Sequence, residues 1–290
     1  MLEVTLDALK DSAIVVATVF VLHVLLSFFE GKIARILNKS RRFAPALGSL
    51  FGLVPECGTS VVGADLYQKN HLTMGTLVAI FLACSDEALP ILFTDYSSTW
   101  YMSFVLLGLK VLIAMGVGFL VDILLGKKNQ KVEEHLEECR GEEEVHVGCC
   151  GHEIEGTHES PWKEHLLHPF LHSLKIFVYV FILNFLFGTL LYLIGEEAIA
   201  AFLSSSKPFS PLFAILIGLI PNCASSVMLA NFYLNGLLPF GALLSGLLVN
   251  AGLGMFVLFK SKEKRKEAFA VLGICVAASL VFGYIFLYVF

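Results

Sequence analysis

An apolar segment that is interrupted in its middle occurs twice in this chain, in one register. Gly52–Ser60 reads GLVPECGTS, and Gly218–Ser226 reads GLIPNCASS, 166 positions later (218 − 52). The match continues without a gap through four identical pairs: Ala64/Ala230, Tyr67/Tyr233, Leu72/Leu238 and Gly75/Gly241. A Pro-x-Cys match arises easily by chance, but so many matches in one register do not. The sequence therefore indicates an internal duplication built around two broken helices.

The composition indicates a membrane protein. Of the 290 residues, 57% are hydrophobic and only 16% are charged, with a mean hydropathy of +0.78. A soluble domain of this size needs more polar surface. The apolar residues form blocks of about 20 residues, the length of a membrane-spanning helix, rather than the short alternating segments of a β-barrel. Most charges are segregated into loops, so no basic face is available for nucleic acid.

Six apolar blocks are long enough to cross a bilayer. They are 8–29, Leu72–Phe93, Ser103–Leu125, Leu174–Ile194, Leu237–Phe259 and Ala268–Phe290. The two broken elements, Ala44–Tyr67 and Phe209–Tyr233, consist of short legs. A leg of 10 or 11 residues spans roughly 16 Å, about half the hydrocarbon core. Neither leg can cross alone, so each broken element is either one interrupted crossing or a re-entrant hairpin.

The charges of the short loops decide between these alternatives. The loops 30–43 and 260–266 are basic and are expected in the cytoplasm, whereas 95–101 lacks Lys and Arg and 195–197 is acidic. This assignment requires each broken element to enter and leave the membrane on the same side. We therefore predict an all-α polytopic fold of two inverted-topology repeats, 1–126 and 172–290, each with three full spans and one re-entrant hairpin. Both termini lie outside, and the loop 127–171 is cytoplasmic.

Broken segments at matching positions of inverted halves indicate a central transport site. Unwound carbonyls before Pro55 and Pro221 suit a cation, and the N–H groups of the restarting legs suit an anion. Intramembrane acids and tip cysteines favour a transition or thiophilic metal. The candidate substrate-binding residues are Glu56, Cys57, Ser60, Asp65, Asn222, Cys223, Ser226 and Asn231. The candidate coupling or pathway residues are Asp86, Glu87 and Asn250, the last standing opposite Cys84 in the duplication.

A structural interpretation stands beside the functional one. The small residues at the helix breaks also serve close helix packing. Asp86 and Glu87 could lie near the outer interface, with Lys110 as their counter-ion.

The loop between the halves is rich in His, Cys and Glu, a composition typical of metal binding. It lacks a CxxC or HxxxH framework, so we expect no closed zinc site and no tightly bound cofactor. His135, His146, His152 and His158 are the candidate ligands of a weak cation buffer or sensor. A solvated acidic linker is the alternative. The seven cysteines form no disulfide pattern.

The duplicated Gly-Leu-[Val/Ile]-Pro-x-Cys tips, the ten hydrophobic pieces and the central loop resemble a bacterial family of ten-helix heavy-metal exporters. Its members carry labels such as arsenic-efflux protein and manganese transporter. The resemblance implies a permease of the bacterial inner membrane that exports a metal or metalloid ion. Because no Gly-x-x-x-x-Gly-Lys-[Ser/Thr] motif is present, the energy is expected from an ion gradient or a partner ATPase.

Three other functions are consistent with parts of the sequence. A carrier of a small anion or organic substrate would use the half-helix N-termini in place of the acids. An intramembrane enzyme could use Cys57 or Ser60 as nucleophile, but no residue is obviously placed to activate either, so we expect no enzyme. A metal sensor would act through the loop 127–171. The expected partners are the lipid bilayer and the transported ion, with a homodimer left open and nucleic acid excluded.

Overall fold

The computed structural model describes a helical chain. The described residues are 43–53, 57–68, 70–84, 88–89, 92, 100–125, 181–182, 185, 189, 207–221, 223–261 and 264–289. Their α-helices are α2 (Ala44–Phe51), α3 (Cys57–Gln68), α4 (Met74–Ala83), α6 (Trp100–Leu124), α10 (Ser210–Gly218), α11 (Cys223–Leu234), α12 (Phe240–Val249), α13 (Gly252–Lys260) and α14 (Arg265–Val289). A 3-10 turn, η3 (Lys207–Phe209), precedes α10. The expected first span, most of the expected span Leu174–Ile194 and the central loop lie outside the described residues.

Helix boundaries in the two halves repeat at the spacing of the sequence duplication. The helices α2, α3 and α4 begin at residues 44, 57 and 74, and α10, α11 and α12 begin 166 positions later at 210, 223 and 240. Each half then continues into a helix of 25 residues, α6 or α14. The duplication therefore extends from the residue pattern to the succession of helices.

The turn after α3 and the turn after α11 have the same hydrogen bonds. Asn70 and Gly236, one duplication apart, both have positive φ, 60° and 71°. The N–H of Asn70 donates to Tyr67, and the N–H of Gly236 donates to Tyr233. The following residue in each turn donates to the carbonyl one position before that tyrosine. This is the Schellman pattern that ends a helix with a left-handed residue.

The short legs of the two broken elements are confirmed as separate helices. α2 has 8 residues and α3 has 12, and α10 and α11 have 9 and 12. Pro45 and Pro211 stand in the first turns of α2 and α10, where a missing N–H costs no hydrogen bond. Each leg is shorter than the hydrocarbon core is thick.

Two segments that we expected as full spans are interrupted helices. The helix expected over Leu72–Phe93 ends as α4, and Cys84 follows it with a non-helical ψ of 128°. The helix expected over Leu237–Phe259 ends as α12, leaves the helical region at Asn250 with ψ 87°, and restarts as α13. Cys84 and Asn250 are one duplication apart (250 − 84 = 166). No proline stands at either break, so the apolar pattern gave no sign of them.

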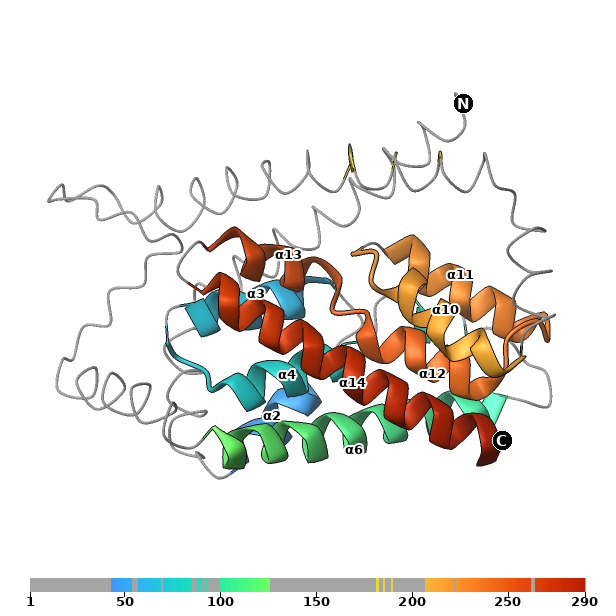
Figure 1. Cartoon of the computed structure of the whole chain (residues 1–290), viewed down its shortest axis with the longest axis horizontal. Helices are drawn as coiled ribbons and strands as arrows, with labels where there is room; N and C mark the ends of the chain where they lie inside the picture. Colours follow the sequence, from blue (N-terminus) through green and yellow to red (C-terminus); the bar gives the residue numbers. More distant parts are fainter. Residues whose placement is uncertain are drawn as a thin grey trace, which may run out of the picture.

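Packing within the two halves follows one scheme. α4 packs against both α2 and α6, and α12 packs against both α10 and α14. Glycines allow the close approach: a Cβ on Gly75 would meet the Gly118 carbonyl oxygen, and a Cβ on Gly241 would meet the Gly283 carbonyl oxygen at 2.5 Å. Figure 1 shows α4 toward one end of the long axis and α12 toward the other, with α13 beside α3.

Three helical segments within the described part of the chain are long and apolar enough to cross a membrane. They are Tyr101–Leu124, Phe240–Lys260, which joins α12 and α13 across their break, and Arg265–Val289. Large apolar side chains stay exposed along α6 and α14, including Leu112, Ile123, Phe269 and Ile285. In water such surfaces would be costly, but in a bilayer they face lipid.

Candidate functional site

The ends of the two interrupted helices meet at a buried lysine. Lys110, in the middle of α6, is fully buried. Its Nζ donates to the carbonyl oxygen of Cys84 at 2.5 Å and to that of Leu247 at 2.9 Å. Cys84 caps the C-terminal end of α4, and Leu247 lies in the last turn of α12. One ammonium group thus joins the C-terminal ends of two helices that come from different halves of the chain.

The opposite end of α4 is held by the other charged residue of α6. Asp122 accepts a hydrogen bond from Thr73 Oγ1 at 2.8 Å and one from the Gly75 N–H at 2.9 Å. Thr73 also caps the helix, accepting from the Thr76 N–H at 3.2 Å. The carboxylate therefore lies at the positive end of the α4 dipole and the ammonium at its negative end. α6 fixes this half-helix at both ends.

The break between α12 and α13 leaves polar backbone and side-chain groups buried inside the protein. Asn250 is only 3% exposed. Its Oδ1 accepts from the Gly252 N–H at 3.1 Å, at the first residue of α13. Its Nδ2 has no hydrogen-bond partner within the part of the chain that the structure describes. Gly252 has φ 55°, which any residue with a Cβ adopts only with strain. We call Cys84, Lys110, Leu247, Asn250 and Gly252 the break centre.

The first broken element contacts the second half beside the break centre. The Ser60 Oγ in α3 accepts from the Gly254 N–H of α13 at 3.2 Å. A Cβ on Gly254 would overlap the Ser60 carbonyl group, so the two backbones touch. Two side chains, Ser60 and Asn250, thus accept hydrogen bonds from N–H groups in the first turn of α13. This helix start is assembled from both halves of the chain.

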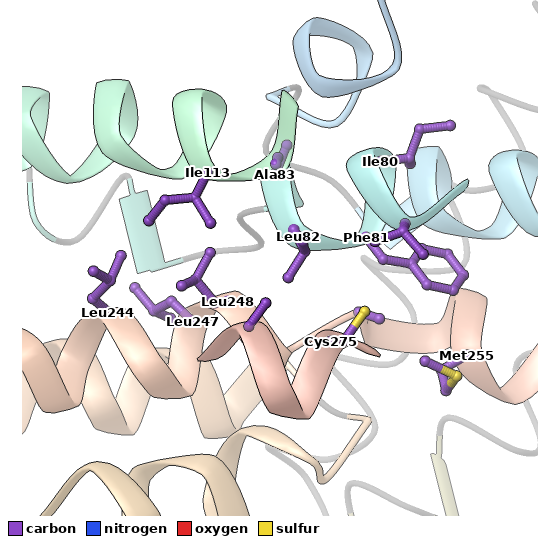
Figure 2. Close-up of a cluster of buried hydrophobic side chains, with 14 of the residues drawn as sticks. Ile80, Phe81, Leu82, Ala83, Ile113, Leu244, Leu247, Leu248, Met255 and Cys275 are labelled. Atoms are coloured by element: carbon purple, nitrogen blue, oxygen red, sulfur yellow. The ribbon is translucent and has the colours of Figure 1, made fainter. Parts of the chain in front are cut away.

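Buried apolar side chains line the helices that form the break centre. Figure 2 shows Ile80, Phe81, Leu82 and Ala83 of α4 and Ile113 of α6 in one cluster with Leu244, Leu247 and Leu248 of α12, Met255 of α13 and Cys275 of α14. Lys110 itself has no exposed surface. A buried polar group costs free energy unless it is hydrogen-bonded. The two hydrogen bonds from Lys110 to backbone carbonyls therefore matter for stability.

The structure brings together only some of the residues singled out in the sequence. Ser60 and Asn250 lie at the start of α13, and Ser226 is buried in α11. Asp65 in α3 is partly buried, whereas Asn231, one duplication later in α11, is exposed. Cys57 and Cys223 are the first residues of α3 and α11. Glu56, Asn222, Asp86, Glu87 and the four loop histidines lie outside the described residues.

The side chains that the structure describes form no metal-binding group. Among them, no three His, Cys, Asp or Glu residues lie close enough together to hold an ion. The candidate acids, Glu56 for substrate binding and Asp86 and Glu87 for coupling or the pathway, are outside the described part. The alternative in which Lys110 is the counter-ion of Asp86 and Glu87 therefore stays untested.

Sequence reasoning missed the contacts of Lys110 and both helix breaks. One signal was available: a single lysine in the middle of an apolar span of 25 residues. A charged side chain in a span almost always faces the protein interior and finds polar partners there. Backbone carbonyls freed by a helix break are such partners, so an isolated lysine in one span is a sign of a broken helix in a neighbouring span.

These features define a multi-pass helical membrane protein with paired interrupted helices. The profile of the family described as "Putative, 10TM heavy-metal exporter" matches residues 1–174 and 156–290. The chain belongs to this family, as the sequence resemblance implied. No curated protein and no solved structure matches the chain.

Proposed function

We propose that this protein is a secondary-active permease that exports a metal or metalloid ion across the bacterial inner membrane by alternating access. The ion is a manganese-like divalent metal or an arsenic species. One observation carries the proposal: the interrupted helices α4 and α12, one duplication apart, converge on Lys110. Discontinuous helices at matching positions are typical of the substrate sites of secondary transporters. Membership of a heavy-metal exporter family supports export.

The two halves are inverted with respect to each other in this proposal, with both termini outside. Figure 1 supports this arrangement, because α6 and α14 run in opposite directions along the long axis. The helices α4 and α12 likewise approach the break centre from opposite ends. Each half then presents one interrupted helix and one re-entrant hairpin to a shared centre, and a rocking motion exposes that centre to one side at a time.

Side chains at the hairpin tips bind the substrate in this mechanism. Glu56 and Asn222 supply oxygen ligands, and Cys57 and Cys223 supply sulfur, a mixture that suits a transition or thiophilic metal. Asp86 and Glu87 follow the first break closely in the sequence and line the pathway or couple protons. We propose a transporter and not an enzyme, because no nucleophile with an activating base is apparent in the sequence. The acids are therefore assigned to substrate binding and to the pathway, not to catalysis.

The deciding measurement is the element content of cells by mass spectrometry. Cells with the wild-type protein, with no protein, with Glu56→Gln and with the loop control Glu159→Gln are loaded with manganese, iron, zinc, cobalt and arsenite. We expect the wild type and the control to deplete one element selectively and Glu56→Gln to lose that depletion. If the wild type depletes none of the five, the protein does not export these ions and the proposal fails.

A carrier of a small anion is the second candidate. It is favoured by the chemistry of the break centre, where Lys110 is a cation and the Asn250 Nδ2 is a buried donor without a partner in the described part of the chain. Such a carrier uses hydrogen-bond donors and helix N-termini in place of carboxylates. In that case Glu56→Gln leaves transport intact, whereas bulky side chains at Ser60 or Ser226 block it.

The loop 127–171 has an accessory role in the proposal, as a weak cytoplasmic cation buffer that uses His135, His146, His152 and His158. Deleting the loop separates a transporter from a sensor. A transporter keeps some export without the loop, whereas a sensor loses its response to metal.

A further inference from the structure

The second leg of the first broken element, α3, packs mainly on the other half of the chain. Among the described helices its most extensive contact is with α13, and its contact with α4 of its own half is smaller. At one end of this contact the backbones of Ser60 and Gly254 touch. Toward the other end, the Gln68 Nε2 donates to the Val257 carbonyl oxygen at 2.9 Å. The boundary between α3 and α13 is therefore a boundary between the two halves.

A cluster of polar side chains joins the halves where α3 ends and α14 begins. The Tyr67 hydroxyl donates to Glu267 Oε2 at 2.6 Å, across 200 positions of the sequence. The Lys264 Nζ donates to the Tyr67 carbonyl oxygen at 2.7 Å and to Asn70 Oδ1 at 2.5 Å, and it lies 4.6 Å from the centre of the Tyr67 ring. We call Tyr67, Asn70, Lys264 and Glu267 the Tyr67 cluster.

The charges of the Tyr67 cluster suit the helix ends that they meet. Lys264 places its ammonium at the C-terminal end of α3, where the helix dipole is negative. Glu267 lies in the first turn of α14, where the dipole is positive. Tyr67 is buried, but Lys264 and Glu267 are only partly buried and Asn70 is exposed. Because polar contacts that water can reach contribute modestly to stability, such a cluster can open and form again.

The second copy of the repeat lacks the counterparts of three members of the cluster. The tyrosine is present in both copies, as Tyr67 and Tyr233. Gly236 stands in place of Asn70, so that turn has no side chain there to accept a hydrogen bond. The stretch 98–102, which corresponds to the start of α14, contains no charged residue. The equivalent turn after α11 therefore cannot form the same cluster.

We propose that the Tyr67 cluster is a reversible gate, which holds α3 against α13 and α14 at one face of the molecule and separates the two halves there when it opens. The inference rests on the proposed alternating access, in which each face opens in turn. The structure shows the gate closed, with the hydrogen bonds of Tyr67 and Lys264 formed. In the proposed topology this face is cytoplasmic, because Lys264 belongs to the basic loop 260–266.

The test measures how often a buried cysteine beside each turn becomes accessible. Ala64, one turn before Tyr67 in α3, and its duplicate Ala230 in α11 are both fully buried. Ala64→Cys and Ala230→Cys are each combined with Tyr67→Phe, which removes the hydroxyl and keeps the ring beside Lys264. Tyr233→Phe is the matched control. The purified full chain in detergent reacts with a maleimide, and peptide mass spectrometry follows the labelling of the introduced cysteine alone.

Tyr67→Phe should raise the labelling rate at position 64 by about three- to tenfold, because the closed gate loses a hydrogen bond to a carboxylate and opens more often. It should leave the rate at position 230 unchanged, and Tyr233→Phe should leave the rate at position 64 unchanged. If Ala64→Cys does not accumulate, Ser60→Cys, at the same boundary, replaces it. An unchanged rate beside Tyr67 overturns the inference, as does an equal rise at both positions, which indicates a general loss of stability.

The labelling rates depend on neither a transported ion nor the orientation of the protein in a membrane. Failure of the gate appears in these rates. Failure of the export proposal appears only in the element content of cells, so the two outcomes are distinguishable.

Discussion

At the scale of single residues, polar side chains complete a backbone that has left the helix. Asn250 and Ser60 both accept N–H groups from the first turn of α13. The first N–H groups of a helix have no partner within it, so a buried helix start depends on such acceptors. Lys110 donates hydrogen bonds to backbone carbonyls at the C-terminal ends of α4 and α12. Each of these side chains lies where a helix end leaves a backbone group without its intrahelical hydrogen bond.

Asn250 offers a prediction at this scale. Asn250→Ala removes the acceptor of the Gly252 N–H and should lower the free energy of unfolding by about 1 kcal/mol. Asn250→Ser keeps a side-chain oxygen and adds no buried charge, so it should lose less. Thermal unfolding of both purified variants measures the difference. Equal stability of the two would mean that the hydrogen bond to Gly252 contributes nothing.

At the scale of helices, glycine sets how closely α4 and α6 pack. A Cβ on Gly118 would lie 2.8 Å from the Gly75 oxygen and 2.9 Å from the Ala79 Cβ. These atoms belong to α4, and a third contact, with Pro45, belongs to α2. The crossing therefore depends on the missing side chain, as is common where membrane helices approach each other.

Gly118→Ala should lower the free energy of unfolding by about 1–3 kcal/mol, because the added methyl group forces α4 and α6 apart. Gly116→Ala is the matched control, since it lies on the same helix, is exposed, and a Cβ there meets nothing within 4 Å. The control should be neutral or slightly stabilising, as alanine favours helix more than glycine does. Thermal unfolding of the two variants side by side is the measurement. A loss of stability in both, or in neither, would show that packing at this crossing is not tight.

At the scale of the whole molecule, the halves share one plan but differ in their charges. Lys110 and Asp122 of α6 hold both ends of α4. No charged residue occurs in α14 after Glu267 in the first turn, so α12 depends on packing and on Lys110 of the other half. The polar connection therefore runs from the first half into the second, and this asymmetry ties the two halves to one centre.

The proposed inversion of the two halves gives a labelling prediction for the whole molecule. Asn70 and Gly236 occupy equivalent exposed turns with positive φ. Asn70→Cys and Gly236→Cys carry the same backbone strain, so each is the control of the other. In a background without native cysteines, a membrane-impermeant thiol reagent should label residue 236 from outside intact cells. Residue 70 should react only in inverted membrane vesicles. Labelling of both positions from one side would disprove the inversion.

Much of the fold was predictable because its signals are local. The proline and small residues near 55 and 221 predicted separate helices, and the legs begin at Ala44, Cys57, Ser210 and Cys223. The apolar blocks at Ser103–Leu125 and Ala268–Phe290 predicted α6 and α14 within a few residues of their bounds. The duplication predicted matching helices in the two halves.

The candidate site was less predictable. Ser60, Asn250 and the buried Ser226 were identified from the duplication, but their partners were not. Asn231 was selected by the same logic and is exposed. A repeat identifies equivalent positions, whereas burial depends on which helix covers each copy, and that neighbour differs between α3 and α11.

The sequence by itself determined the class of protein, the duplication, the short legs of the two broken elements and the family, because length, apolar composition, proline and repeat spacing act within a segment or between aligned copies. Only the tertiary structure decided where α4 and α12 end. No proline stands at Cys84 or Asn250, and Gly252 and the other glycines of these apolar segments do not by themselves mark which position breaks the helix. At the C-terminal ends of α4 and α12, Lys110 of α6 donates to the Cys84 and Leu247 oxygens. At the start of α13, Ser60 and Asn250 accept hydrogen bonds from backbone N–H groups. Those partners are far apart in the chain and meet only when the helices have packed.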